Sequence, residues 1–271
     1  MHRLRAAVSA QAPVRTFALK GPCGESDGPG VSIVPFLLFA MLAAPALALL
    51  RRAGRGPGIE RLVALFLLLL GLGMALRLHA VGDGGRVDPV ANAAGHVALS
   101  GAVLFLYRFT RVVFRPDALW ARRLELVGAG GTLATLGVLA LDGGYSDETA
   151  ASILAANAFR ALSCGWSFAE ALRYRRSMQR RAALGLGDPL VANRFLLWSL
   201  WMGSLTLSLA FVLAMRVAAH ASGPALESMV PALLPIVRGV MAATSGAALV
   251  ALWLTFFPPP AYQRWAGNVA R

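Results

Sequence analysis

The amino-acid sequence predicts an all-α protein, an integral membrane bundle of seven transmembrane helices with its N-terminus outside and its C-terminus in the cytoplasm. The chain of 271 residues is 57% hydrophobic and only 14% charged, whereas about one quarter of the residues in soluble domains are charged. Apolar runs of about 20 residues, the length that crosses a bilayer, recur along the chain. Arginines gather in every second connection between these runs, as the positive-inside rule requires.

The apolar runs define the elements in order. The seven runs are residues 32–50, 61–79, 89–113, 124–142, 149–172, 190–218 and 229–256. The fourth run is rich in glycine and the fifth contains Arg160, so these two depart most from a uniform apolar span. The sixth and seventh are long enough to tilt or to protrude. Pro258, Pro259 and Pro260 end the last helix, because proline cannot continue one.

Two of the predicted helices begin in the same way. Asp88-Pro89 opens the third and Asp188-Pro189 opens the sixth, each pairing an N-cap acid with a proline at the first helical position. The two starts fall on opposite membrane faces, which would also fit the inverted repeat of a transporter. Capping by itself explains both.

The chain divides into three predicted regions. Residues 31–257 form the seven-helix domain and residues 258–271 form a short cytoplasmic tail. Residues 1–30 contain Arg3, Arg5, Arg15 and Lys20, which an outside N-terminus would have to carry across the membrane. We expect these 30 residues to be either a disordered tail or a mis-assigned start, with the native chain beginning near Val31.

The charge distribution sets the orientation and excludes nucleic acid as a partner. The 26 basic residues exceed the 13 acidic ones and are all arginine except Lys20. Nucleic-acid-binding proteins cluster such residues on a soluble face, whereas here they stand between apolar runs. Most follow the first, third and fifth runs or lie in the C-terminal tail, so that side is predicted to be cytoplasmic and to contact membrane lipids.

Polar residues inside the apolar runs form one predicted layer. At about 1.5 Å rise per residue, His96, Arg160 and Arg238 all fall in the outer half of the membrane. Asn92 shares a helical face with His96, and Asn157 shares one with Arg160. The two arginines either reach outward to acidic residues at the helix ends, or bind an anionic group together with the other three residues. Intramembrane ionisable residues are by default functional.

The histidines suggest a different site. His79, His96 and His220 all lie toward the outer side and could hold a metal ion or haem. No two of them are spaced to share a helical face, so interfacial histidines in contact with water are the alternative. The cofactor is unknown from sequence. A retinal Schiff base is excluded, because the seventh run contains no lysine.

Catalytic motifs give no indication of an enzyme. The sequence lacks the phosphate-binding GxxxxGK[ST], the metalloprotease HExxH and the hydrolase GxSxG patterns. The tail after the last run is too short for a kinase or cyclase domain, so a signal would have to pass to another protein.

Two blocks carry a resemblance to a known group of proteins. LGLGDPLVANRFLLW at residues 184–198 and LTFFPPPAYQRWAGN at residues 254–268 resemble segments of poorly characterised bacterial heptahelical membrane proteins that are sensor-like. The resemblance implies a sensory role in the bacterial cytoplasmic (inner) membrane. It supplies no ligand and no catalytic residue.

The sequence therefore favours a receptor-like or sensory protein that binds a small anionic or amphipathic ligand in the outer half of the bundle. The expected binding residues are Asn92, His96, Asn157, Arg160 and Arg238. A small transporter of an anionic solute and a metal- or haem-binding membrane protein remain alternatives. The basic stretch 173–188 is the predicted contact for a cytoplasmic protein partner. Small residues at helical spacing, such as Ala242 and Gly246, would also fit a homo-oligomer.

Overall fold

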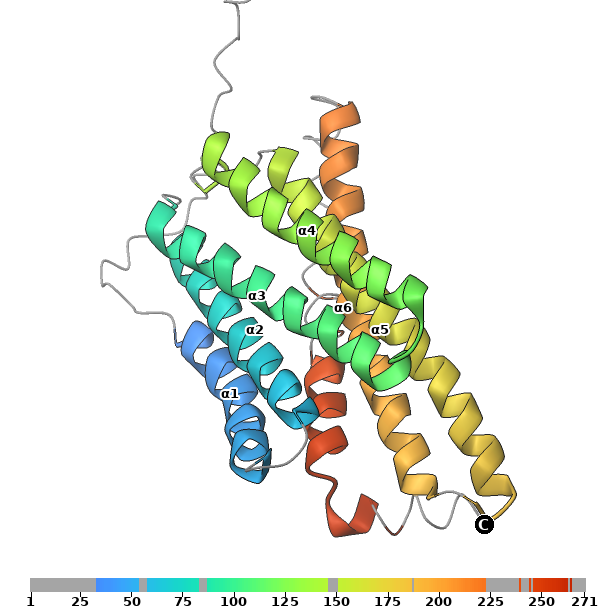
Figure 1. Ribbon diagram of the computed structural model, residues 1–271. Coiled ribbons are helices and arrows are strands. Elements are labelled where there is room, and N and C mark those ends of the chain that lie inside the picture. The colour runs from blue at the N-terminus through green and yellow to red at the C-terminus, as the bar shows by residue number, and fades with distance from the viewer. Residues whose placement is uncertain are drawn as a thin grey trace, which may run out of the picture. The chain divides into compact units, whose positions relative to one another are not determined.

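The structure is a computed structural model, and all regular secondary structure in its described residues is helical (Figure 1). It describes residues 33–53, 58–82, 87–145, 151–186, 188–222, 239, 244, 246–262 and 264. The helices are α1 (Val34–Ala53), α2 (Ile59–Gly82), α3 (Pro89–Phe114), α4 (Leu119–Leu141), α5 (Ala151–Ala183) and α6 (Pro189–Ser222), followed by a short apolar helix, Gly246–Phe256. The predicted all-α class is confirmed.

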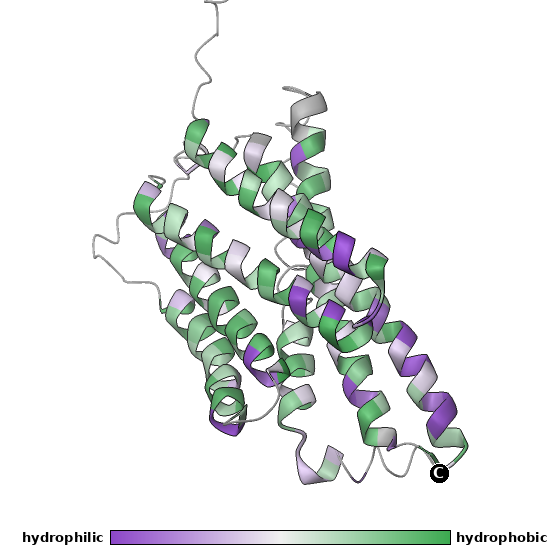
Figure 2. Ribbon diagram, viewed as in Figure 1, coloured by the Kyte–Doolittle hydropathy of each residue, from purple (hydrophilic) through white to green (hydrophobic). Residues whose placement is uncertain are grey.

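Five of these helices are long and apolar enough to cross a membrane. They are Val34–Ala53, Ile59–Ala80, Pro89–Phe114, Leu119–Leu141 and Leu190–Ala218. Hydrophilic residues are frequent in the last turns of α5 (Figure 2). The segment Gly246–Phe256 covers only the end of the predicted seventh run, whose remainder lies mostly outside the described residues. A helical membrane bundle is thus supported, while the number seven and the orientation stay predictions.

The domain boundaries stay a prediction. Residues 33–271 form one compact unit. The predicted N-terminal tail, residues 1–30, lies outside the described residues, and so does most of the predicted C-terminal tail, residues 258–271.

Helix α3 occupies the middle of the arrangement, because it contacts α2, α4 and α5. Helix α1 packs on α2, and α5 packs on α6 (Figure 1). Helices α2 and α3 approach closely at Gly73 and Gly95. A Cβ atom added at Gly73 would lie 2.6 Å from Leu99 Cγ and 2.9 Å from the Gly95 carbonyl oxygen. Small residues allow two helix backbones to come this near.

Two of the four glycines in α4, Gly128 and Gly131, have a packing role. The Tyr107 ring of α3 covers Gly128, where an added Cβ would lie 2.3 Å from ring atom Cζ, and the Phe159 ring of α5 covers Gly131 at 2.1 Å. The Tyr107 hydroxyl also donates a hydrogen bond of 3.2 Å to the Phe159 carbonyl oxygen. The glycine-rich run is therefore a helix whose surface receives two aromatic rings.

Both predicted N-cap acids cap their helices. Asp88 Oδ1 accepts hydrogen bonds from Val90 N at 2.9 Å and Ala91 N at 3.3 Å, and Asp188 Oδ1 accepts one from Leu190 N at 2.8 Å. These bonds satisfy donors that the first helical turn leaves open. They set the register in which α3 presents its side chains to its neighbours.

The arginine-rich end of the bundle comprises the ends of α1, α3 and α5 and the starts of α2, α4 and α6. Two of the acidic residues at this end, Glu125 and Glu170, form ion pairs with its arginines. Glu125 pairs with Arg108 and Arg111. Glu170, whose side chain is 2% exposed, pairs with Arg115 at 3.0 Å and Arg173 at 3.1 Å. Four arginines that the sequence assigned to the membrane surface thus bind carboxylates of the protein itself.

Candidate functional site

The α3 face predicted to be polar is buried. Asn92 and His96 are each 0% exposed, and Ser100, one turn further on, is also buried. The Asp88 cap and Pro89 start the helix at a fixed residue, and a spacing of four residues then places these side chains on one face. The interior of the bundle therefore contains an amide and an imidazole close to the start of α3.

The guanidinium of Arg160 joins α5 to this face. The Arg160 side chain is only 6% exposed. Its Nη1 donates to Asn157 Oδ1 at 2.8 Å, and its Nη2 contacts His96 Nδ1 at 2.9 Å. A guanidinium can only donate hydrogen bonds, so His96 Nδ1 acts as the acceptor and the ring hydrogen lies on Nε2. Asn157 and His96 thus help to orient the guanidinium.

Asn92 extends the network to α2 and to the turn after α4. Its Nδ2 donates to the Tyr145 carbonyl oxygen at 2.9 Å, and its Oδ1 accepts from Arg77 Nε at 3.3 Å. The Arg77 stem lies on Gly95, where an added Cβ would be 2.6 Å from Arg77 Cγ. Close packing of α2 on α3 therefore directs Arg77 toward the side-chain amide of Asn92.

The Tyr145 ring covers the network from the turn that follows α4. Its centroid lies 5.9 Å from that of His96, and its hydroxyl donates to the Leu136 carbonyl oxygen at 3.1 Å. Burial and the nearby carboxylate of Asp142 raise the pKa of the Tyr145 hydroxyl. The hydroxyl therefore stays protonated at physiological pH and keeps its bond to α4.

We call this set the central polar cluster: Arg77, Asn92, His96, Tyr145, Asn157 and Arg160. It includes four of the five binding residues expected from sequence. The fifth, Arg238, lies outside the described residues. Sequence reasoning missed Arg77 and Tyr145. Arg77 could have been predicted, since it stands inside the apolar run 61–79 as Arg160 stands inside 149–172. Tyr145 could not, because it joins the cluster through its backbone carbonyl and its ring, which no sequence pattern indicates.

The structure describes the predicted histidine site only in part. His79 is exposed near the end of α2, His96 belongs to the central polar cluster, and the side chain of His220 is outside the described part of α6. In the portion of the chain that the structure describes, no three His, Cys, Asp or Glu side chains come together in a way that could hold a metal ion.

The cluster has a defined chemical character. Two guanidiniums supply planar donor forks, which match the oxygens of a carboxylate or phosphate. Two asparagines and a histidine hold them in place, and an amide or imidazole can also bind a polar group of a ligand. An anion beside such a cluster would be stabilised by two positive charges in a low-dielectric interior.

No known protein family matches the chain, and neither a curated protein nor a solved structure shows detectable similarity to it.

Proposed function

We propose that this chain is a receptor-like or sensory multi-pass membrane protein that binds a small anionic or amphipathic molecule through the central polar cluster. The observation that supports it most is the buried Arg160 guanidinium, which Asn157 and His96 hold from two different helices. A charge is costly inside a membrane, so proteins place it there chiefly where it has a task.

The proposed orientation follows from the arginines. Exposed arginines at the end of α5, among them Arg176, Arg180 and Arg181, would face the cytoplasm of a bacterial inner membrane, with the central polar cluster in the outer half. Helix α5 continues to Ala183 (yellow, lower right in Figure 1). Its last turns and the following loop, residues 173–188, would offer a basic surface to anionic lipid or to a cytoplasmic partner protein.

Native mass spectrometry of the protein purified in mild detergent tests the proposed site. We expect the parent chain to carry a defined extra mass, and Arg160→Leu to lose it. Arg160→Lys keeps the charge but lacks the planar fork, so it should retain less of the bound mass than the parent. Arg180→Leu is the matched control, because Arg180 is an exposed arginine on the same helix, and should retain the mass fully.

The opposite result would identify a structural arginine. If parent and Arg160→Leu both lack an extra mass, and the variant only melts at a lower temperature, Arg160 serves to hold α3 and α5 together. If the mass is present in all four chains, the ligand binds elsewhere. Uptake of the identified anion into liposomes that contain the protein would instead identify the protein as a transporter of that anion.

A further inference from the structure

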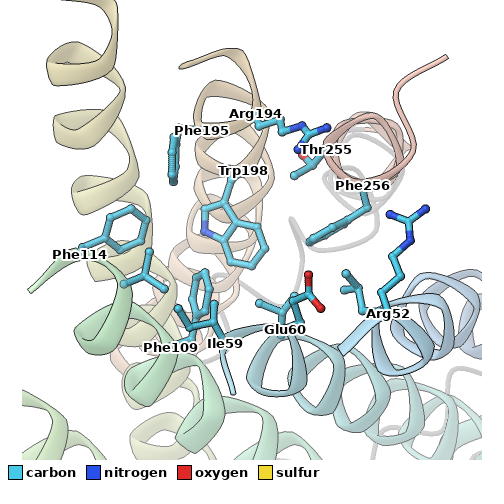
Figure 3. Close-up of a pocket in the computed structure, with 13 residues that line it drawn as sticks. Arg52, Ile59, Glu60, Phe109, Phe114, Arg194, Phe195, Trp198, Thr255 and Phe256 are labelled. Carbon is cyan, nitrogen blue, oxygen red and sulfur yellow. The ribbon is translucent and has the colours of Figure 1, made fainter. Parts of the chain in front are cut away.

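A cavity of about 420 Å³ lies at the arginine-rich end (Figure 3). Its walls come from α1, α2, α3, α6 and the helix Gly246–Phe256. None of the residues of the central polar cluster lines it. Its volume is within the range of sites that hold small molecules or parts of larger ones.

The inner wall of this cavity is aromatic. The Phe109 and Trp198 ring centroids are 5.0 Å apart, and those of Trp198 and Phe256 are 6.2 Å apart. Trp198 Nε1 donates to Ser167 Oγ at 3.0 Å, so its one polar atom is bound to α5. The rings therefore offer a fixed apolar surface to whatever occupies the cavity.

Charges of both signs border the same cavity. Figure 3 shows Glu60 of α2, Arg52 of α1 and Arg194 of α6 around the aromatic rings. None of the ion pairs formed by described residues includes these three side chains. Arg52 lies over the Phe257 ring at 5.7 Å from its centroid. The border thus presents two cations and one carboxylate above an apolar wall.

We propose that this cavity binds a phospholipid with a zwitterionic, primary-amine headgroup. Arg52 and Arg194 would contact the phosphate, which suits guanidinium forks, and Glu60 would accept hydrogen bonds from the ammonium. Phe109, Trp198 and Phe256 would pack against the glycerol and the first part of an acyl chain. The cavity holds this part of the lipid, while the remaining chain extends into the bilayer.

The mixed charge and the aromatic wall distinguish this ligand from its competitors. A headgroup with a negative charge only would meet repulsion from the Glu60 carboxylate. A free phosphate or a free headgroup would leave the aromatic wall uncovered, although apolar contact supplies much of the affinity in such sites. The ends of membrane helices also lie at the depth of lipid headgroups.

Competition between lipids, followed by native mass spectrometry of the full chain in detergent, tests the proposal. Phosphatidylethanolamine and phosphatidylglycerol with identical acyl chains are added together. We expect the parent to prefer phosphatidylethanolamine by about fivefold, as for one partly exposed charge pair. Glu60→Gln should remove this preference, whereas Arg194→Gln and Arg52→Gln should weaken binding of both lipids. Arg123→Gln, at an exposed arginine of α4 that does not line the cavity, should keep the preference of the parent.

Three results would overturn the proposal. The parent could bind the two lipids equally, or Glu60→Gln could keep the preference of the parent. Soluble O-phosphoethanolamine could also displace the lipid at equal concentration, which would identify the free headgroup as the ligand. Each variant is first checked for a single gel-filtration peak. If Glu60→Gln fails this check, the two arginine variants test the proposal instead. The proposal is then overturned if Arg52→Gln and Arg194→Gln bind both lipids as well as the parent does.

Discussion

Replacing both Arg115 and Arg173 with methionine is expected to destabilise the protein by about 3 kcal/mol or more. These arginines hold the Glu170 carboxylate at 3.0 Å and 3.1 Å, and Glu170 is 2% exposed. Without them a buried negative charge has neither of these two cations to compensate it. Thermal unfolding in detergent, followed by tryptophan fluorescence, measures the loss.

The single and triple variants identify the cause. Arg173→Met alone should cost about 1 kcal/mol or less, because its side chain is mostly exposed and such pairs are weak. Adding Glu170→Gln to the double variant removes the buried charge and should recover most of the lost stability. If the triple variant melts no higher than the double one, the methionines act through lost packing of the arginine stems and the charge is irrelevant.

Replacing Gly73 with alanine is expected to destabilise the protein by about 1 to 3 kcal/mol. An alanine Cβ would meet Leu99 Cγ at 2.6 Å, and the Gly95 oxygen and Leu99 nitrogen at 2.9 Å. Two of these atoms belong to the α3 backbone, so α2 must move away from α3. The movement would also withdraw Arg77 from Asn92, and the thermal midpoint reports the lost packing.

Gly137→Ala is the matched control. Gly137 is also a helical glycine, but nothing lies within 4 Å of an added Cβ there. Alanine stabilises an open helix position by up to about 1 kcal/mol relative to glycine, so this variant should melt at or slightly above the temperature of the parent. Equal midpoints for the two variants would show that α2 and α3 are not packed as closely as the structure places them.

Local patterns in the sequence predicted much of the helical framework. Apolar runs located α1 to α6 to within a few residues at most ends, because an apolar stretch of membrane length has few alternatives to a helix. Asp88-Pro89 predicted the start of α3, and the helical period placed Asn92 and His96 on one face. The last run, 229–256, was predicted by the same signal, and of it the structure describes residues 239 and 244 and the helix Gly246–Phe256.

Which faces meet was decided by the tertiary structure alone. Helical period shows that Arg160 shares a face with Asn157, but only packing of α5 against α3 brings its Nη2 to His96 Nδ1. The approach of α2 to α3 at Gly73 likewise directs Arg77 to Asn92. Such contacts join residues far apart in the chain, and they depend on which small side chains let two backbones come close.

The arginines show the same division between sequence and structure. Their placement in alternate connections is a property of the sequence and predicts which end faces the cytoplasm. The sequence could not show which of them bind Glu125 and Glu170 and which, like Arg52 and Arg194, border a cavity beside Glu60. Side-chain partners are set by distances of a few ångströms between helices. An arginine in the sequence therefore specifies a positive charge but not the group that it binds.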